Sequence, residues 1–385
     1  MPVLLHDWFC LREGRDNFKP HNVNDRKLVF CHQDLFNDEI LNSIQSRFAT
    51  NEPVKMLILG DWGVGKTHGV NHICWWLDEN NSDYPAYHVV IEVGDVSRSS
   101  RFDVLVRPFL QKMGLDFIID IVHGYKQINP NLVRALIQAS VSPLVAEAFS
   151  KFLLATPGDT PPQNVRDSFE YLKGHKLTGE AARMGLGQQL TESTDLYSVL
   201  LAVGEMYRAV HSHRIIFIAD EAAKLETVDT DDATRAHWIN ANKLILDENN
   251  NAFGFVYTIS ARRDQLPASL YEHQLRNRLG DNVFEIKNLA PQDVGVFLTA
   301  LVDEFVDRAK VETLVAAGEI VAAAYRWEDY PFESSAHEQF IDHFNRTQED
   351  AKPRDICSKL TDVAFIAAKL NKRLIDEECL RRGKL

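Results

Sequence analysis

The chain has 385 residues, of which 45% are hydrophobic, and this is enough for one large domain or two ordinary ones with buried cores. Its 42 basic and 55 acidic side chains give a net charge of −13, which argues against a protein that coats nucleic acid nonspecifically. The five cysteines form no Cys-x-x-Cys pair, which favours free thiols in a reducing compartment. The early charges exclude a signal peptide, and no stretch approaches the roughly 18 apolar residues of a membrane span, so we expect a soluble, cytoplasmic protein with no membrane partner.

A helix and a buried strand are expected near the beginning of the chain. Residues 1–27 are polar and irregular, and we expect them to form an N-terminal arm. His32–Thr50 carries apolar side chains at helical spacing, which predicts a helix. Met56–Leu59 is a short continuous apolar run, which is typical of a buried strand.

This strand leads directly into a phosphate-binding motif. The residues are Gly60, Asp61, Trp62, Gly63, Val64, Gly65, Lys66 and Thr67, and they match G-x-x-x-x-G-K-[ST] at every fixed position. Glycines allow a tight turn whose N–H groups point inward, and the following helix adds its positive N-terminal end. Lys66 can reach terminal phosphates, and the Thr67 hydroxyl can bind Mg²⁺. We therefore expect residues 60–68, His68 included, to bind a nucleotide; the alternative is a glycine-rich turn without a ligand.

Four further strands are expected along the chain. They are Tyr87–Val93, Ile215–Ala219, Phe253–Ile259 and Asn282–Ile286. Helical spacing is found in the intervening and following segments: Val104–Met113, Asp232–Leu246, Ser269–Leu279, Pro291–Ala309, Val311–Tyr325, His337–Phe344 and Arg354–Leu370. Strands that alternate with helices and are continuously apolar predict a parallel sheet with both faces covered.

The stretch between the second and third strands is too long for a simple crossover. It runs from about residue 115 to 210, is mostly helical in pattern, and predicts a helical insertion. No strand pattern follows residue 290, and the chain ends in a tail of mixed charge. The expected domains are therefore an arm at 1–27, an α/β core at 28–290, and a helical region with its tail at 291–385.

An acidic pair follows the third strand. Asp220 would hold Mg²⁺ through water, opposite Thr67. Glu221 would act as the general base toward the attacking water. The alternative is a pair of solvated charges that cap the next helix.

Together these segments resemble an AAA+ ATPase, which implies a three-layer P-loop α/β core, a C-terminal helical lid, and ATP as the nucleotide. Within that superfamily the chain resembles the origin-recognition and transposition-regulator clade, and bacterial ATP-binding proteins of BREX-type phage-defence loci. The resemblance covers about Leu28–Leu370. It is most specific in residues 60–67, in Ile215–Leu225, and in the segment 171–210 before that strand.

The resemblance implies further site residues. A polar sensor-1 side chain is expected at the end of the fourth strand, where Ser260 fits first and Thr258 is the alternative. An arginine finger is expected before the last strand, where Arg278 is the first choice and Arg276 the second. Arg354 resembles a sensor-2 arginine, which would contact the γ-phosphate from the lid. Each of these has an ordinary alternative as a strand-end cap or a surface arginine.

The resemblance also implies ATP hydrolysis at a subunit interface, because the finger of one copy cannot easily reach its own nucleotide. We expect a homo-oligomeric ring or filament that acts on DNA or a DNA-bound partner protein, as a loader, a matchmaker or a phage-defence component. The alternative is a STAND-like switch that binds protein partners, hydrolyses slowly and has no role on DNA. The acidic charge and the long insertion favour that alternative, and the missing repeat domain counts against it.

Overall fold

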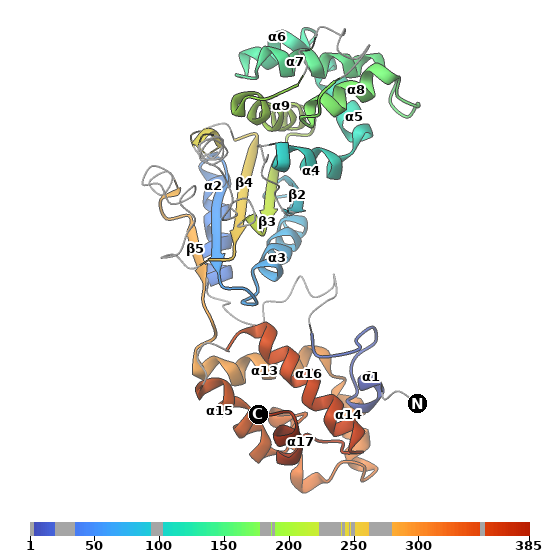
Figure 1. The fold of residues 1–385 in the computed structure, drawn as a ribbon, viewed down its shortest axis with the longest axis vertical. Coiled ribbons are helices and arrows are strands. Elements are labelled where there is room, and N and C mark those ends of the chain that lie inside the picture. Colours follow the sequence, from blue (N-terminus) through green and yellow to red (C-terminus); the bar gives the residue numbers. More distant parts are fainter. Residues whose placement is uncertain are drawn as a thin grey trace. The chain divides into compact units, whose positions relative to one another are not determined.

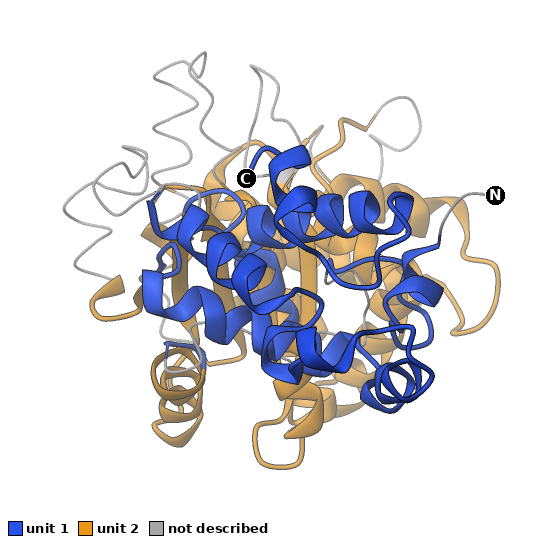
Figure 2. Cartoon of the chain, turned by 90° about the horizontal axis from the view of Figure 1, so that it is seen from below, with its two compact units in different colours: residues 1–36, 61–72, 286–385 blue, residues 37–60, 73–285 orange. Residues whose placement is uncertain are grey.

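A computed structural model describes residues 4–19, 35–93, 103–177, 186, 189–222, 240, 243–245, 247, 251–261, 279–346 and 351–385. The chain divides into two compact units, which Figure 2 distinguishes by colour. Residues 37–60 and 73–285 form one, which we call the sheet unit. Residues 1–36, 61–72 and 286–385 form the other, the helical unit.

The sheet unit is built on a five-stranded sheet with the order β2-β3-β4-β1-β5 (Figure 1). The strands are β1 (Lys55–Gly60), β2 (Ala86–Glu92), β3 (Arg214–Asp220), β4 (Phe253–Ile259) and β5 (Val283–Ile286). The β2–β3, β3–β4 and β4–β1 pairs are parallel. Every residue of β3 and β4 is buried, as expected for central strands that are covered on both faces. The predicted parallel α/β sheet is therefore confirmed, with strand boundaries within a residue or two of those expected.

Helices flank the sheet and fill the long segment between β2 and β3. The first of them are η2 (Leu35–Leu41), α2 (Asn42–Ala49), α3 (Lys66–Glu79) and α4 (Asp103–Met113). The long segment contains α5 (Leu115–Ile128), α6 (Leu132–Gln138), α7 (Pro143–Ser150), η3 (Lys151–Leu154), α8 (Gln163–Leu172) and α9 (Ser193–His211). The predicted helical insertion between the second and third strands is therefore confirmed in the described residues.

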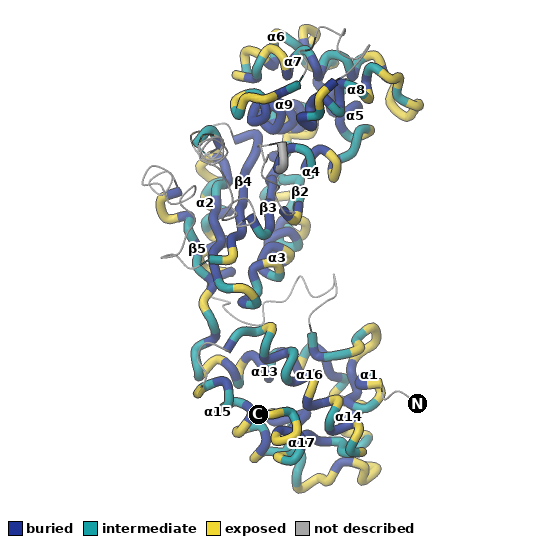
Figure 3. The backbone as a smooth tube through the Cα atoms, in the orientation of Figure 1, coloured by how far each residue is buried: buried dark blue, intermediate teal, exposed yellow. Residues whose placement is uncertain are grey.

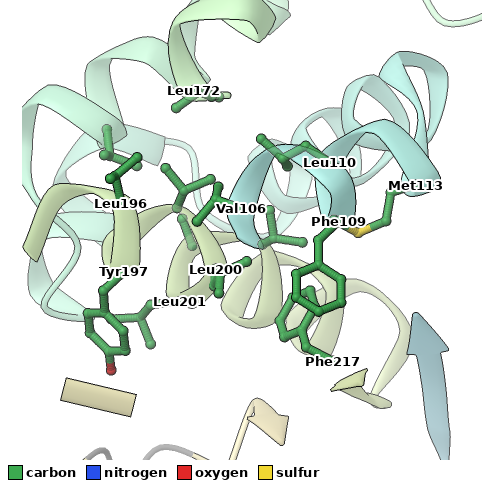
Figure 4. Close-up of a cluster of buried hydrophobic side chains, with 14 of the residues drawn as sticks. Val106, Phe109, Leu110, Met113, Leu172, Leu196, Tyr197, Leu200, Leu201 and Phe217 are labelled. Atoms are coloured by element: carbon green, nitrogen blue, oxygen red, sulfur yellow. The ribbon is translucent and has the colours of Figure 1, made fainter. Parts of the chain in front are cut away.

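Aromatic side chains join α4 to the sheet. The ring of Phe109 meets Phe217 of β3 edge to face, with 4.9 Å between the centroids, and Phe255 of β4 at 5.8 Å. Leucines and valines of α4 and α9 surround this contact in Figure 4. The β-strands and the inserted helices therefore share one continuous hydrophobic core.

The helical unit has its own core (Figure 3). Its helices are α1 (Leu5–Trp8), α13 (Pro291–Phe305), α14 (Arg308–Ala316), α15 (Ser334–Arg346), α16 (Pro353–Lys369) and α17 (Glu377–Arg382), with short 3₁₀ turns η6 (Ala322–Ala324) and η7 (Trp327–Asp329). The described N-terminal residues pack into this core, because Phe9, Leu11 and Phe18 are fully buried and Leu11 pairs with Val306. Residues 4–19 are therefore a part of the helical unit, although their polar sequence suggested an arm.

Two predicted helices are shorter in the structure. The helix expected over Val311–Tyr325 ends at Ala316, because Gly318 adopts a φ of +75° and the chain turns. The helix expected over Pro291–Ala309 ends at Phe305, where Val306 takes an extended conformation. The charged tail contains the helix α17, which was not predicted.

Several expected elements lie wholly or partly outside the described residues. They include most of Asp232–Leu246, most of Ser269–Leu279, and the first residues of His32–Thr50. Within the described part of the chain, no helix has the length and apolar character needed to cross a membrane.

Candidate functional site

The loop after β1 has the backbone of a tight turn. Gly63 and Gly65 have φ values of +89° and +105°, a region that side chains with a Cβ rarely adopt. Helix α3 begins at Lys66, immediately after the second of these glycines. A Cβ added to Gly65 would meet no atom within 4 Å, so the space beside this glycine is open. A glycine-lined turn that opens at a helix N-terminus fits an anion.

The lysine of the motif lies along this loop. Lys66 is only 6% exposed, and its Nζ donates a hydrogen bond to the carbonyl of Asp61 at 2.8 Å. The ammonium is thus held beside the turn where terminal phosphates would lie. The next residue, Thr67, is exposed, which keeps this position accessible to a metal ion and its water. The residues present therefore fit a nucleoside triphosphate.

Arg354 of α16 contacts the same loop. Its backbone N–H donates to the carbonyl of Gly63 at 3.2 Å, and its guanidinium carbon lies 3.8 Å from the ring centroid of Trp62. A Cβ on Gly63 would come within 3.3 Å of the Arg354 Cβ, so the glycine also permits this close approach. The predicted sensor-2 residue is thus next to the phosphate-binding loop, stacked on a tryptophan that is 57% exposed.

A phenylalanine packs against the first turns of α3. A Cβ on Gly69 would lie 2.2 Å from the ring of Phe36, so only glycine allows this contact. Phe36 also meets the His72 ring edge to face, at 6.3 Å between centroids. Sequence reasoning missed this pair, since Phe36 precedes Gly69 by more than thirty residues.

The acidic pair lies at the carboxyl edge of the sheet. Asp220 is the last residue of β3 and is 5% exposed. Because β1, β3 and β4 are parallel, Gly60, Asp220 and the end of β4 all lie at this edge. The loop 61–67 belongs to the helical unit, and Asp220 belongs to the sheet unit.

Thr258 links the two acidic residues. Its hydroxyl donates to Asp220 Oδ1 and accepts a hydrogen bond from the Glu221 N–H at 3.0 Å. The same N–H lies 3.0 Å from Asp220 Oδ1. Thr258 is fully buried in β4, so these bonds form away from water. One threonine hydroxyl therefore fixes both the Asp220 carboxylate and the backbone of Glu221.

Glu221 has a strained backbone. Its φ is +57°, in the left-handed region that costs a non-glycine residue on the order of 1–3 kcal/mol. The bonds from Asp220 and Thr258 hold the residue in this conformation. Such strain is common at active sites.

The sensor-1 and arginine-finger candidates remain to be placed. Ser260, the first choice for sensor 1, lies one residue beyond β4 and is exposed, whereas the alternative Thr258 contacts the acidic pair. Arg276 and Arg278 lie outside the described residues. The structure thus forms two groups, Thr258 with Asp220 and Glu221, and Arg354 with the phosphate-binding loop.

Comparisons with known proteins show the fold. No protein-family model matches the sequence, and no curated protein matches it. Three solved structures are similar. The ORC2 protein of Aeropyrum pernix, with ADPNP and ADP, has a TM-score of 0.50 at 10% identity over 91% of this chain and 71% of that chain. The ORC1 protein of the same organism, with DNA, has a TM-score of 0.49 at 11% identity over 95% and 67%. Cdc6p of Pyrobaculum aerophilum has a TM-score of 0.49 at 12% identity over 95% and 69%.

The similarity to the Aeropyrum pernix ORC2 protein supports a shared fold. The other two structures have TM-scores below 0.5 and are not evidence for the fold. The strand order, the parallel sheet and the C-terminal helices agree with the α/β core and helical region that the sequence predicted. The chain therefore has the α/β core and helical region that the sequence predicted from its resemblance to AAA+ proteins, and it shares this fold with the Aeropyrum pernix ORC2 protein.

Proposed function

We propose that the chain binds ATP with Mg²⁺, hydrolyses the ATP, and uses nucleotide-dependent assembly to act on DNA or on a DNA-bound partner. The observation that carries this proposal is the loop before α3, in which two glycines at positive φ precede a buried lysine. The nucleotides in the Aeropyrum pernix ORC2 structure support a nucleotide here. The role on DNA follows from the resemblance to origin-recognition proteins.

The residues of the proposed site would have distinct roles in phosphate binding, metal binding and hydrolysis. Gly63, Gly65 and Lys66 would bind the phosphates, while Thr67 and Asp220 would hold Mg²⁺. The metal ion would neutralise charge on the phosphate oxygens. Glu221 would accept the proton of the attacking water, and its constrained backbone would keep the carboxylate in place.

Thr258 and Arg354 would have two separate roles in this reaction. Thr258 would fix the Asp220 carboxylate and so fill the sensor-1 role, with Ser260 as the competing candidate. Arg354 would leave the Trp62 ring and contact the γ-phosphate, since a guanidinium binds phosphate more strongly than an aromatic face. Nucleotide state would then be coupled to the position of α16.

Arg278, or else Arg276, would serve as a finger for the nucleotide of a neighbouring copy. Such a finger makes hydrolysis depend on a homo-oligomeric ring or filament. We therefore propose that assembly and turnover are coupled, as in a DNA loader, a matchmaker or a phage-defence component.

The first prediction concerns Glu221→Gln. The variant keeps its phosphate-binding loop but loses the base, so we expect ATP binding to persist while hydrolysis falls by about 100-fold or more. In ATP it should accumulate as an assembly on duplex DNA, which light scattering after size-exclusion chromatography measures. Glu338→Gln, at an exposed site on α15, is the matched control and should behave as the unmodified chain.

Absence of both DNA-stimulated hydrolysis and ATP-dependent assembly on DNA would contradict the proposal. Nucleotide-dependent capture of a protein partner, with no response to DNA, would instead support the STAND-like alternative.

The second prediction separates the two sensor-1 candidates. Thr258→Val removes a hydroxyl that donates to a carboxylate, and we expect the hydrolysis rate to fall by about tenfold or more. Thr258→Ser restores the hydroxyl and should recover most of the rate. Ser260→Ala should have little effect if Thr258 fills the role. The opposite ranking, measured in variants with matched melting temperatures, would assign the role to Ser260.

The third prediction uses Trp62 as a reporter. Since Arg354 covers its ring, ATP should change the Trp62 fluorescence as the guanidinium moves to the phosphate. Arg354→Gln should abolish this change and weaken ATP binding by about tenfold. Arg381→Gln, at an exposed site on α17, should do neither. A fluorescence change that survives in Trp62→Phe would show that the signal comes from elsewhere, and would remove this support for a moving Arg354.

A further inference from the structure

A cavity lies in the sheet unit. Its volume is about 610 Å³, and its lining includes residues that come just before strands, among them Asn51, Pro85 and Asn251, together with Arg214, the first residue of β3. The sheet is parallel in this region, so the cavity is at the amino edge. β3 has seven residues, which separates the cavity from Asp220 by roughly 20 Å.

A buried arginine forms one wall of this cavity. Arg214 is 8% exposed, and its Nη1 donates to the carbonyls of Glu52 at 2.7 Å and Arg47 at 3.3 Å. Its Nη2 lies 3.4 Å from Asn51 Oδ1, and its guanidinium stacks on the Phe48 ring at 4.1 Å. All of these partners are neutral groups. Within the described part of the chain, Arg214 forms no ion pair with a carboxylate.

A second arginine reaches the same cavity from α9. Arg208 is exposed, and its Nη1 donates to Asn251 Oδ1. Asn251 is itself 7% exposed and donates through Nδ2 to Asn51, so its amide orientation is fixed. Arg208 also has no carboxylate partner among the described residues. Among the lining residues that the structure describes, the one carboxylate is that of Asp83, which is exposed.

The two arginines repel each other, and burial leaves Arg214 incompletely solvated. Burial and the nearby charge of Arg208 lower the pKa of Arg214 to about 10. Arg214 remains charged near pH 7, and none of the residues that the structure describes supplies a carboxylate to this buried cation. Burial of a charge is unfavourable unless another group compensates it. An anion in the cavity would supply that compensation.

The rest of the lining suits a small polar ligand. The amides of Asn42 and Gln45 and the hydroxyls of Ser46 and Ser212 offer hydrogen bonds, and Tyr84 adds an aromatic surface. The volume lies within the range of small-molecule sites, about 300–1,000 Å³. Guanidinium groups match the paired oxygens of phosphate and carboxylate.

We propose that this cavity, the Arg208–Arg214 pocket, binds a small molecule through a phosphate or carboxylate group, independently of the phosphate-binding loop. Arg214 provides the fixed charge at the base of the site, and Arg208 closes on the ligand from the rim.

The test uses full-length Lys66→Ala protein, in which binding at the phosphate-binding loop is weakened. Inorganic pyrophosphate, AMP and citrate are titrated separately by calorimetry at constant ionic strength, which distinguishes a bare phosphate, a nucleotide and a carboxylate source. We expect at least one of them to bind with a stoichiometry of one. Adding Arg208→Gln should weaken that binding by about tenfold or more. Arg134→Gln removes an exposed arginine of α6, and should leave the affinity unchanged.

Arg214→Lys is the second variant, because it keeps the charge and removes the planar fork. It should also weaken binding by about tenfold. The proposal is overturned if none of the three probes binds at millimolar concentration, or if Arg208→Gln and Arg134→Gln have equal effects. A third outcome would also overturn it: no small anion binds, but Arg208→Gln changes the oligomeric mass. That result would mean that an acidic group of another chain occupies the pocket.

Discussion

The backbone turn between β1 and α3 is the constraint on which the proposed site depends. The chain leaves a buried strand at Gly60 and begins a helix at Lys66, so the intervening residues must form a tight turn. Gly63 and Gly65 make this possible through positive φ values. Gly63 leaves room for the approach of Arg354, and the open space beside Gly65 leaves room for an anion. A side chain at either position would strain the turn and obstruct or distort the site.

The parallel sheet brings the remaining groups together. Parallel strands direct all their carboxyl ends to one edge, where Asp220 and the end of β4 become neighbours although 37 residues separate Thr258 from Glu221 in the chain. Buried hydrogen bonds then hold the carboxylate and the strained backbone. At the amino edge, the parallel strands also bring together residues that precede several strands. These residues line the Arg208–Arg214 pocket.

Much of this architecture could be predicted from the sequence, and the reasons are physical. Strands buried on both faces must be continuously apolar, which is why β3 and β4 were located within a residue of their observed ends. The phosphate-binding loop could also be predicted, because its backbone requires glycines at fixed positions before the lysine. The contact of Thr258 with the acidic pair was less visible, since a threonine in an apolar strand looks like an ordinary β-branched residue. The pocket around Arg214 was invisible, because its residues meet only after the strands have paired. The end of α14 was missed because alanine and valine continue the helical spacing beyond Ala316.

The most direct test of the central claim is the affinity of Lys66→Ala for ATP with Mg²⁺, measured by calorimetry beside the unmodified chain. The loop account predicts that the variant, which retains the turn but loses the buried ammonium, binds at least about tenfold more weakly, because a charge-assisted bond to phosphate is lost. Lys369→Ala, at an exposed site at the end of α16, should bind as the unmodified chain does. Equal affinity of Lys66→Ala and the unmodified chain would contradict the claim that this loop holds a triphosphate.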